Sequence, residues 1–351
     1  MSNDDMTGHF EKRLKAARKM AGLSLEDLAR KAGGIVTRQA ISKYEKGRMK
    51  PGGVVLDRLA MALNVRPEFF LRAPQLDIST LHFRSHSRLS VKNEEALLHR
   101  TVDFLERYME IEDVLGIRSA FENPLSRNSL TELGDIERAA IELRRGWGLG
   151  YSPIVNMLQL LEDKGIKVCE VEGIPGFDGL SARMGRSFVI VVNRDLPPDR
   201  IRFTAAHELG HILCAFPDEC DRANLCHEFA GALLLPKTIL KRRFLERRSK
   251  VTLWELQDIK QGYGISMQAV MYRARALGLI SGSHFQDFRD LMKKNDWLIM
   301  EPYVYHGRER ATRFKRLLHY AVAESIIPEA RASALAGLTR EAFRKDMQAL
   351  I

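Results

Sequence analysis

The feature that most constrains this chain is the run RFTAAHELGHILCA, which occupies residues 202–215. Its apolar residues recur with helical spacing, so the run predicts a helix. His207 and His211 are four residues apart and project from one face of that helix, with Glu208 beside them. Two such imidazoles can bind one Zn²⁺, and the carboxylate can take a proton from metal-bound water. The run thus predicts a zinc peptidase site; an amphipathic helix with two hydrogen-bonded histidines is the plainer alternative.

Size and composition indicate a globular protein of more than one domain. The 351 residues suffice for two or three domains, and a content of 45% hydrophobic and 28% charged residues is typical of soluble proteins. No apolar stretch approaches the roughly 20 residues of a membrane span, and the polar start MSNDDMTGHF lacks the features of a signal peptide. We therefore expect a cytoplasmic protein. Because structural disulfides are rare in the cytoplasm, we expect the cysteines to be free thiols or metal ligands. They are Cys169, Cys214, Cys220 and Cys226.

The first fifth of the chain carries most of a strong basic excess. The formal net charge is +10, and residues 1–72 contain 15 Lys or Arg against 8 Asp or Glu. Such a local excess points to a polyanionic partner. The same region predicts five short helices, of which two are capped by Ser24 and Thr37 and cover 24–33 and 37–46. This pair predicts a helix-turn-helix, whose second helix can enter the DNA major groove.

This stretch closely resembles the helix-turn-helix domains of the Cro and repressor type, through the segments LSLEDLARKAG, TRQAISKYEKGRMKP and LDRLAMALNV. The resemblance implies double-stranded operator DNA as a partner. It also implies a set of side chains that face the DNA: Thr37, Arg38, Gln39, Ser42 and Lys43. Arg and Gln can pair with base edges, while Lys and Ser can meet phosphates. We expect Ile41 and Tyr44 to belong to the core; a helical protein-interaction module is the alternative.

The whole chain is expected to be mainly α with a small β-sheet. Strands are indicated only at 166–171, in the hairpin GFDGLSARMGRSFVIVVNRD and near Trp297. A long amphipathic helix over 94–115 is a candidate dimer surface. Residues 253–281 resemble a second small helix-turn-helix, and two such elements favour a homodimer on a symmetric operator. The expected parts are an all-α helix-turn-helix domain at 1–73, a helical linker at 74–135, an α+β peptidase domain at 136–282 and a mixed α/β tail at 283–351.

Residues 136–282 resemble the metallopeptidases of the ImmA/IrrE type. The resemblance rests on separated motifs in order: FVIVVNRDLPPDRIRFTAAHELGHILC, LCHEFAGALLLP and YGISMQAVMYRARALGLI. It implies a zincin-like fold, in which the active-site helix packs against a small sheet, and Zn²⁺ as cofactor. It also implies His207 and His211 as ligands and Glu208 as general base. Known members of the family cleave repressor proteins or act beside toxin–antitoxin and mobile-element regulators.

One position departs from the family pattern. In the family a second helix supplies a Glu as third ligand, four residues before the Asn or His that precedes the Phe-Ala, and here this position is Ala223. Alanine cannot bind metal. His227 lies on the same helix face and can itself reach the metal, which would give a site of three His. The alternatives are a site that binds metal weakly or not at all, and a substitute ligand from the set Asp218, Glu219, Asp221, Glu228, Cys220 and Cys226.

Together these patterns predict a DNA-binding transcriptional regulator fused to a zinc metallopeptidase that cleaves a repressor- or antitoxin-like partner protein, in the setting of toxin–antitoxin or stress-response control. The alternative is a regulator whose zincin domain is catalytically inactive and senses a ligand or partner, which Ala223 favours. A purely structural metal is a third hypothesis. Four side chains are eligible to stabilise an oxyanion: Tyr263, Tyr272, Arg273 and His284.

Overall fold

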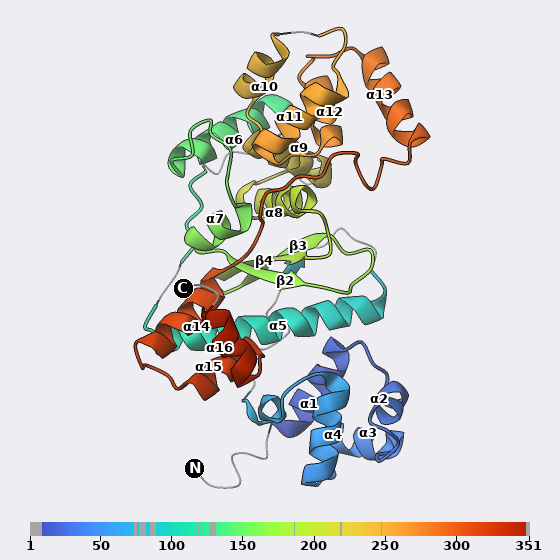
Figure 1. Cartoon of the computed structure of the whole chain (residues 1–351), viewed down its shortest axis with the longest axis vertical. Helices are drawn as coiled ribbons and strands as arrows, with labels where there is room; N and C mark the ends of the chain where they lie inside the picture. The colour runs from blue at the N-terminus through green and yellow to red at the C-terminus, as the bar shows by residue number, and fades with distance from the viewer. Residues whose placement is uncertain are drawn as a thin grey trace. The chain divides into compact units, whose positions relative to one another are not determined.

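The computed structural model describes residues 9–73, 76, 82–84, 89–117, 120–125, 131–185, 187–217, 220–246 and 248–348. The chain forms two compact units, whose elements are labelled in Figure 1. The first unit comprises Met1–Leu81, Arg88–Ser119 and Thr312–Ile351, and the second His82–Ser87 and Ala120–Ala311. The predicted linker and the predicted tail are therefore each divided between the two units. None of the described helices combines the length and the apolar character that crossing a membrane requires.

Five helices at the start of the first unit form the predicted helix-turn-helix domain. They are α1 (Phe10–Met20), α2 (Leu25–Lys31), α3 (Arg38–Glu45), α4 (Gly53–Leu63) and the 3₁₀ helix η2 (Pro67–Leu71). The Ser24 side chain accepts a hydrogen bond from the Asp27 amide and completes a capping box on α2, while Thr37 caps α3 through the Ala40 amide. The helices enclose a common core that includes Leu14, Leu28, Ile41, Leu59 and Phe70.

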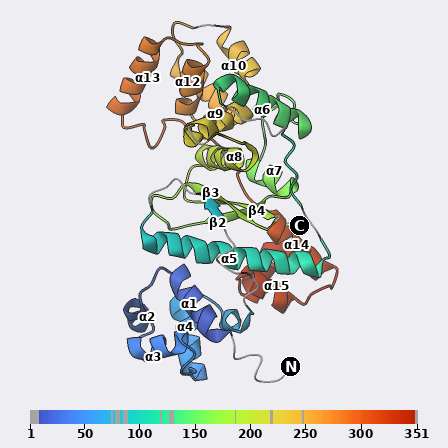
Figure 2. The ribbon, with the colours of Figure 1, turned by 180° about the vertical axis from the view of Figure 1, so that it is seen from behind.

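The first unit also contains α5 (Val91–Val114) and three C-terminal helices, α14 (Arg313–Ala323), α15 (Glu329–Ala336) and α16 (Arg340–Gln348). The buried carboxylate of Glu106 on α5 lies 2.7 Å from Arg13 of α1. Tyr108 of α5 stacks on Phe314 of α14 with ring centroids 5.3 Å apart. Figure 2 shows α14 and α15 at one end of α5. The apolar face of α5, proposed from the sequence as a dimer surface, therefore packs inside its own unit.

A four-stranded sheet forms the base of the second unit, with the strand order β1-β3-β4-β2. Its strands are β1 (His82–Arg84), β2 (Lys167–Val171), β3 (Gly179–Met184) and β4 (Ser187–Asn193). β3 and β4 form the predicted antiparallel hairpin, β2 pairs with β4 in parallel, and β1 adds an antiparallel edge to β3. The sequence does not predict β1, because three residues carry too little periodicity to indicate a strand.

Among the described residues, eight helices complete the second unit: α6 (Leu133–Gly146), α7 (Met157–Asp163), α8 (Pro198–Leu213), α9 (Arg222–Leu234), α10 (Lys237–Phe244), α11 (Leu253–Tyr263), α12 (Met267–Ala276) and α13 (Gly282–Lys294). α8 is the central element, since it packs on β3 and β4 and also on α9 (Figure 1). Its apolar side contributes Ala205 and Leu209 to a core that also holds Ile190 and Phe229. The mainly helical fold class with a small sheet is thus confirmed.

The stretch after α13 differs from the sequence prediction. Residues 297–299 lie in a turn and residue 300 in a bend, so the strand predicted near Trp297 is wrong. The following stretch crosses the second unit and meets the fully buried Arg202 of α8, which donates to the Tyr305 hydroxyl at 2.6 Å and lies 3.4 Å from the Glu309 carboxylate. Glu309 also accepts a hydrogen bond from the Met157 amide at 2.8 Å. A buried cation with several oxygen partners fixes the position of α8.

Candidate functional site

The two histidines of α8 lie together as the sequence predicts. Their Nε2 atoms are 3.1 Å apart. Two ligands of a tetrahedral zinc, each at about 2.0–2.1 Å, would lie about 3.3 Å apart. The pair therefore fits the requirements of one shared ion, and His207 and His211 are the residues that would hold it.

A sulfur atom on α9 orients His211. The Cys226 Sγ lies 3.4 Å from His211 Nδ1, and both side chains are buried. A contact at Nδ1 directs Nε2 toward the ligand position, as partners of metal-binding histidines do. The glycine in the run HELGH permits this contact, because a Cβ at Gly210 would lie only 3.2 Å from Cys226 Sγ and from Phe229 Cδ1. The sequence pattern by itself does not reveal this role of Cys226.

Glu208 points from α8 toward strand β3. Its side chain is buried, and burial raises the pKa of the carboxyl to about 7, although Ser181 of β3 acts in the opposite direction by favouring the carboxylate. A carboxyl group with a pKa near neutrality can both accept and return a proton. Gly179 on the same strand allows this approach, because a Cβ there would lie 2.4 Å from Thr204 Cγ2 and 3.6 Å from Glu208 Cγ.

We expect Gly179→Ala to lower the free energy of unfolding by about 1–3 kcal/mol, because the added methyl group would force β3 away from α8. Urea denaturation of the purified full chain would measure the change. Gly262→Ala is the matched control, since Gly262 lies in α11 and a Cβ there would meet nothing within 4 Å. The control is expected to be neutral or slightly stabilising. Equal stability of the two variants would contradict the close packing of β3 on α8.

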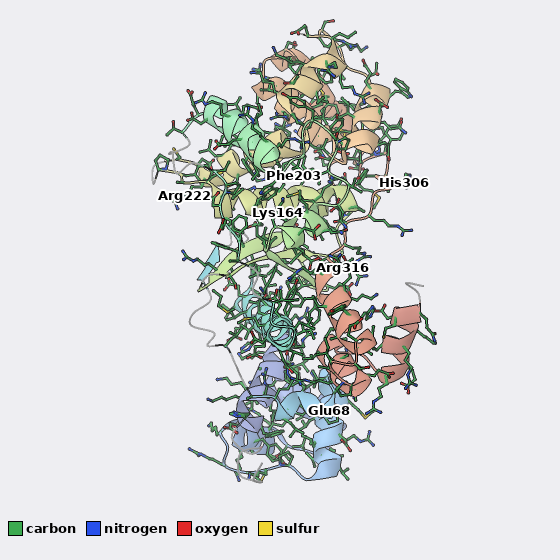
Figure 3. The ribbon with its side chains drawn as sticks, turned by 90° about the vertical axis from the view of Figure 1, so that its left-hand side faces the viewer. Glu68, Lys164, Phe203, Arg222, His306 and Arg316 are labelled. Atoms are coloured by element: carbon green, nitrogen blue, oxygen red, sulfur yellow. The ribbon has the colours of Figure 1, made fainter. Side chains whose placement is uncertain are left out.

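His227 lies beside the pair but is held by its own helix. Its Nδ1 is 2.8 Å from the Ala223 carbonyl oxygen, so Nδ1 donates there and only Nε2 can serve as a ligand. Its exposed ring lies 4.3 Å from the His207 ring and 5.8 Å from the ring of Phe203, which Figure 3 labels on α8. Within the described parts of the chain, no group of three or more His, Cys, Asp or Glu side chains has the geometry of a metal site. The third ligand of the predicted three-His site is thus close, but not assembled.

The other candidate ligands have different surroundings. Glu228 is half-buried with Arg273 and Glu137 as its main charged neighbours, and burial raises the pKa of its carboxyl. The Asp221 side chain caps α9 by accepting from the Asn224 amide at 3.1 Å. The sulfur of Cys226 contacts Nδ1 of His211 and not the paired Nε2 atoms. Two further candidates lie outside the described residues: Asp218 and Glu219.

Three of the four candidates for oxyanion stabilisation are engaged in structural contacts. Arg273 is buried and forms a two-point ion pair with Glu137, at 2.7 and 3.0 Å. His284 accepts a hydrogen bond from the Val251 amide at 2.9 Å. Tyr272 packs edge-on against Phe285, with ring centroids 4.8 Å apart. These contacts hold helices α6, α12 and α13 in place.

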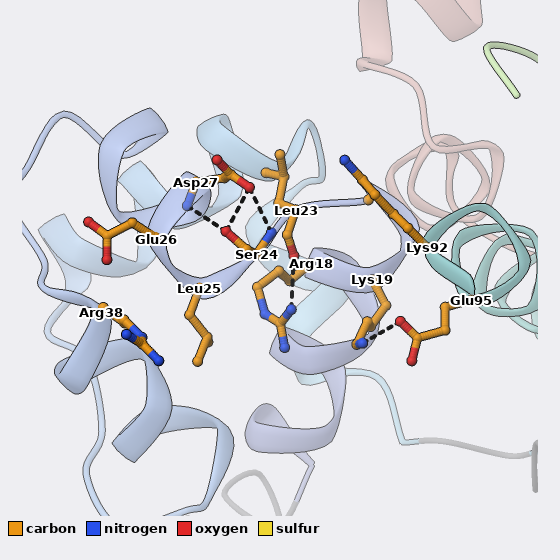
Figure 4. Close-up of a pocket in the computed structure, with 11 residues that line it drawn as sticks. Arg18, Lys19, Leu23, Ser24, Leu25, Glu26, Asp27, Arg38, Lys92 and Glu95 are labelled. Atoms are coloured by element: carbon orange, nitrogen blue, oxygen red, sulfur yellow. Dashed lines mark hydrogen bonds and ion pairs between the residues drawn. The ribbon is translucent and has the colours of Figure 1, made fainter. Parts of the chain in front are cut away.

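The start of α3 carries the residues predicted to face DNA. Thr37, Arg38, Gln39 and Lys43 are exposed, and Ser42 is half-buried; Ile41 and Tyr44 are buried, as expected of core positions. A cavity of about 510 Å³ lies next to this surface, between the end of α1, the start of α2 and the start of α5 (Figure 4). Opposite charges meet within it, where Lys19 pairs with Glu95. The cavity therefore belongs to the junction of α5 with the helix-turn-helix domain.

In the second predicted helix-turn-helix, formed by α11 and α12, the start of the would-be DNA-reading helix α12 is covered by another part of the chain. Glu301 occupies the start of α12, where it accepts hydrogen bonds from the Met267 and Gln268 amides, each at 2.9 Å. The same carboxylate lies 2.7 Å from the ammonium of Lys260. Since a DNA-reading helix uses its first residues, this arrangement removes α12 as a groove-binding helix. The pair α11 and α12 therefore gives no support to a homodimer on a symmetric operator.

Comparison with known protein families matches both parts of the chain. Residues 14–70 match the family described as helix-turn-helix, and residues 161–275 match a peptidase family described as IrrE N-terminal-like domain. The chain joins a helix-turn-helix domain to an IrrE-like domain. No curated protein matches the chain. The IrrE-like match begins after α6, although α6 packs on α9 within the same unit.

Proposed function

We propose that this chain is a DNA-binding transcriptional regulator whose IrrE-like domain is a zinc metallopeptidase acting on a repressor- or antitoxin-like protein in the cytoplasm. One observation carries the enzymatic half: His207 and His211 bring their Nε2 atoms to 3.1 Å from each other, and the buried Glu208 follows directly in the sequence. The family match supports this proposal, since the matched family is one of peptidases.

The residues of α8 and β3 define the proposed mechanism. His207 and His211 would hold the zinc, whose contribution when bound is to acidify a water and to polarise the scissile carbonyl. Glu208 takes the proton of the attacking water and returns it to the leaving amine, so that one residue acts as base and then as acid. Its burial and the pKa of about 7 suit both steps. The Cys226 contact keeps the His211 ring in its ligand orientation.

The metal content of the chain purified without chelators tests the enzymatic proposal. We expect about one zinc per chain in the wild type and none in His211→Ala, because the variant keeps only one imidazole of the paired His207 and His211 and the His227 ring is not assembled with it into a site. His306→Ala is the control, because His306 is an exposed histidine of the same unit (Figure 3). Elemental analysis of the three proteins provides the measurement. Absence of metal from all three would favour the alternative function below.

The alternative is a regulator whose IrrE-like domain has lost catalysis and acts as a receptor for a ligand or partner. Ala223 favours it, together with the incomplete third-ligand position among the described residues. The response of the Glu208→Gln variant to partner proteins distinguishes the two functions. A receptor would keep this response in the variant, whereas a peptidase would lose it.

The exposed start of α3 supports the DNA-binding half of the proposal. We expect Arg38→Ala and Gln39→Ala each to lower the affinity for a selected operator by about 5- to 150-fold, since a bidentate contact to a base contributes about 1–3 kcal/mol of discrimination. Electrophoretic mobility shifts at fixed salt would measure the loss. Lys12→Ala, which removes an exposed cation from α1, is the comparison variant. If Arg38→Ala and Gln39→Ala bind the operator as tightly as Lys12→Ala does, α3 is not the reading helix.

A further inference from the structure

The C-terminal helices α15 and α16 have the connection of a helix-turn-helix. α15 ends at Ala336, α16 begins at Arg340, and three residues join them: Gly337, Leu338 and Thr339. Gly337 has a φ of +70°, so it ends α15 in the left-handed conformation that favours glycine. A turn of three or four residues that contains glycine is typical of the connection in DNA-binding helix pairs.

The start of α16 repeats the start of α3 in sequence. Residues 339–345 read TREAFRK and residues 37–43 read TRQAISK, so four of the seven positions are identical. The repeat is also structural, because each threonine caps its helix. Thr37 Oγ1 accepts from the Ala40 amide at 3.2 Å, and Thr339 Oγ1 accepts from the Ala342 amide at 3.1 Å.

The two helices also bury and expose equivalent positions. The fifth residue of each segment is a core residue, since Ile41 is 0% exposed and Phe343 1% exposed. Arg340 and Lys345 are exposed, as are Arg38 and Lys43 at the matching positions of α3. The C-terminal stretch 312–351 contains seven Lys or Arg against four Asp or Glu, which suits a polyanionic partner.

The C-terminal pair is anchored to the domain that contains α3. Arg66, at the start of η2, donates to the Leu338 carbonyl oxygen at 3.0 Å. Arg107 of α5 donates to the Leu335 carbonyl oxygen at 2.8 Å. Both bonds are accepted by carbonyl oxygens of residues that precede α16, so they leave the first residues of α16 exposed. Figure 1 shows α14, α15 and α16 as one group of helices, all of which belong to the first unit.

We propose that α15 and α16 form a second helix-turn-helix, with α16 as a DNA-contacting helix, so that one chain contacts two segments of the same duplex. This inference rests on the proposed DNA-binding role of α3 and adds a contact to it. Arg340 and Lys345 meet phosphates or base edges at the second segment. The Glu329 carboxylate, 2.9 Å from Arg344 Nε, holds that guanidinium at the start of α15 when DNA is absent.

The test uses the full chain and duplexes of 60 base pairs selected by it from a random-sequence pool. Affinity is measured against salt concentration, and the protected region by nuclease footprinting, for the double variant Arg340→Ala/Lys345→Ala. We expect an affinity loss of about tenfold or more, a salt slope lower by about 0.9 for each lost phosphate contact, and a shorter footprint. The control is Arg316→Ala, which removes an exposed cation from α14 of the same group (Figure 3).

Each outcome separates this inference from the proposed function. If the double variant behaves like Arg316→Ala while Arg38→Ala/Gln39→Ala loses binding, the second element is overturned and the role of α3 stands. If only the C-terminal variant loses binding, α16 is the reading helix and the proposed role of α3 fails. A chain that selects no duplex overturns both. A C-terminal variant that loses only a protein complex, with an unchanged footprint, makes α16 a protein-binding helix and overturns the inference.

Discussion

A chain with Glu208→Gln is expected to keep its zinc but to hydrolyse peptide bonds about 10²- to 10⁴-fold more slowly, the range that a positioned acid–base group contributes. Glutamine preserves the size of the side chain and cannot take a proton from water. The ligands His207 and His211 remain unchanged, so metal content and hydrolysis should separate. Hydrolysis of a quenched fluorescent peptide library by the zinc-loaded full chain measures peptidase activity, and elemental analysis measures the zinc content.

The matched control for this experiment is Glu228→Gln, which alters a half-buried carboxyl of the neighbouring helix α9. We expect it to retain both zinc and activity, because Arg273 and Glu137 are the main charged neighbours of Glu228. If the control instead loses both, Glu228 is the missing third ligand. If Glu208→Gln hydrolyses the library as fast as the wild type, Glu208 is not the general base.

Ala223→Glu is expected to raise the affinity for zinc by at least about tenfold, which corresponds to about 1.4 kcal/mol, and to raise peptidase activity with it. The half-buried Ala223 lies one turn before His227, whose Nδ1 contacts the Ala223 carbonyl oxygen. A glutamate there would complete the two-His, one-carboxylate set that catalytic zinc sites use. Competition with a fluorescent zinc chelator measures the affinity.

Ala223→Gln serves as the comparison, because it adds a side chain of the same length without the charge. We expect it to change zinc affinity little, since an amide oxygen is a weaker zinc ligand than a carboxylate. If Glu and Gln have the same small effect, residue 223 does not face the metal position. In that case His227 or a residue of the preceding loop must supply any third ligand.

The helix-turn-helix domain could be predicted from the sequence because its signals are local. Ser24 and Thr37 cap their helices within three residues of themselves, and both caps are present in the structure. The pairing of His207 with His211 is equally local, because a spacing of four residues places two side chains on one helix face whatever the rest of the fold does. For these elements, helix capping and residue spacing within a few positions are sufficient to predict the structure.

The surroundings of the catalytic candidates could not be predicted in the same way. Ser181 and Gly179 reach Glu208 from strand β3, and Cys226 reaches His211 from α9. Each of these contacts joins residues that are distant in sequence, so no periodicity or spacing indicates it. The covering of α12 by Glu301 is of the same kind, and it reverses an expectation that the local pattern of α11 and α12 supports.

The sequence by itself determined the short helices of the helix-turn-helix domain, the caps of α2 and α3, and the placement of His207 and His211 on one face of α8, because backbone hydrogen bonding and helix periodicity act over a few residues. The tertiary structure alone decided that the C-terminal helices return to the unit of the helix-turn-helix domain and that the face of α5 is buried there. It also decided that Glu208 has a pKa near 7. These properties depend on burial and on partners from remote segments, which only the packed chain brings together.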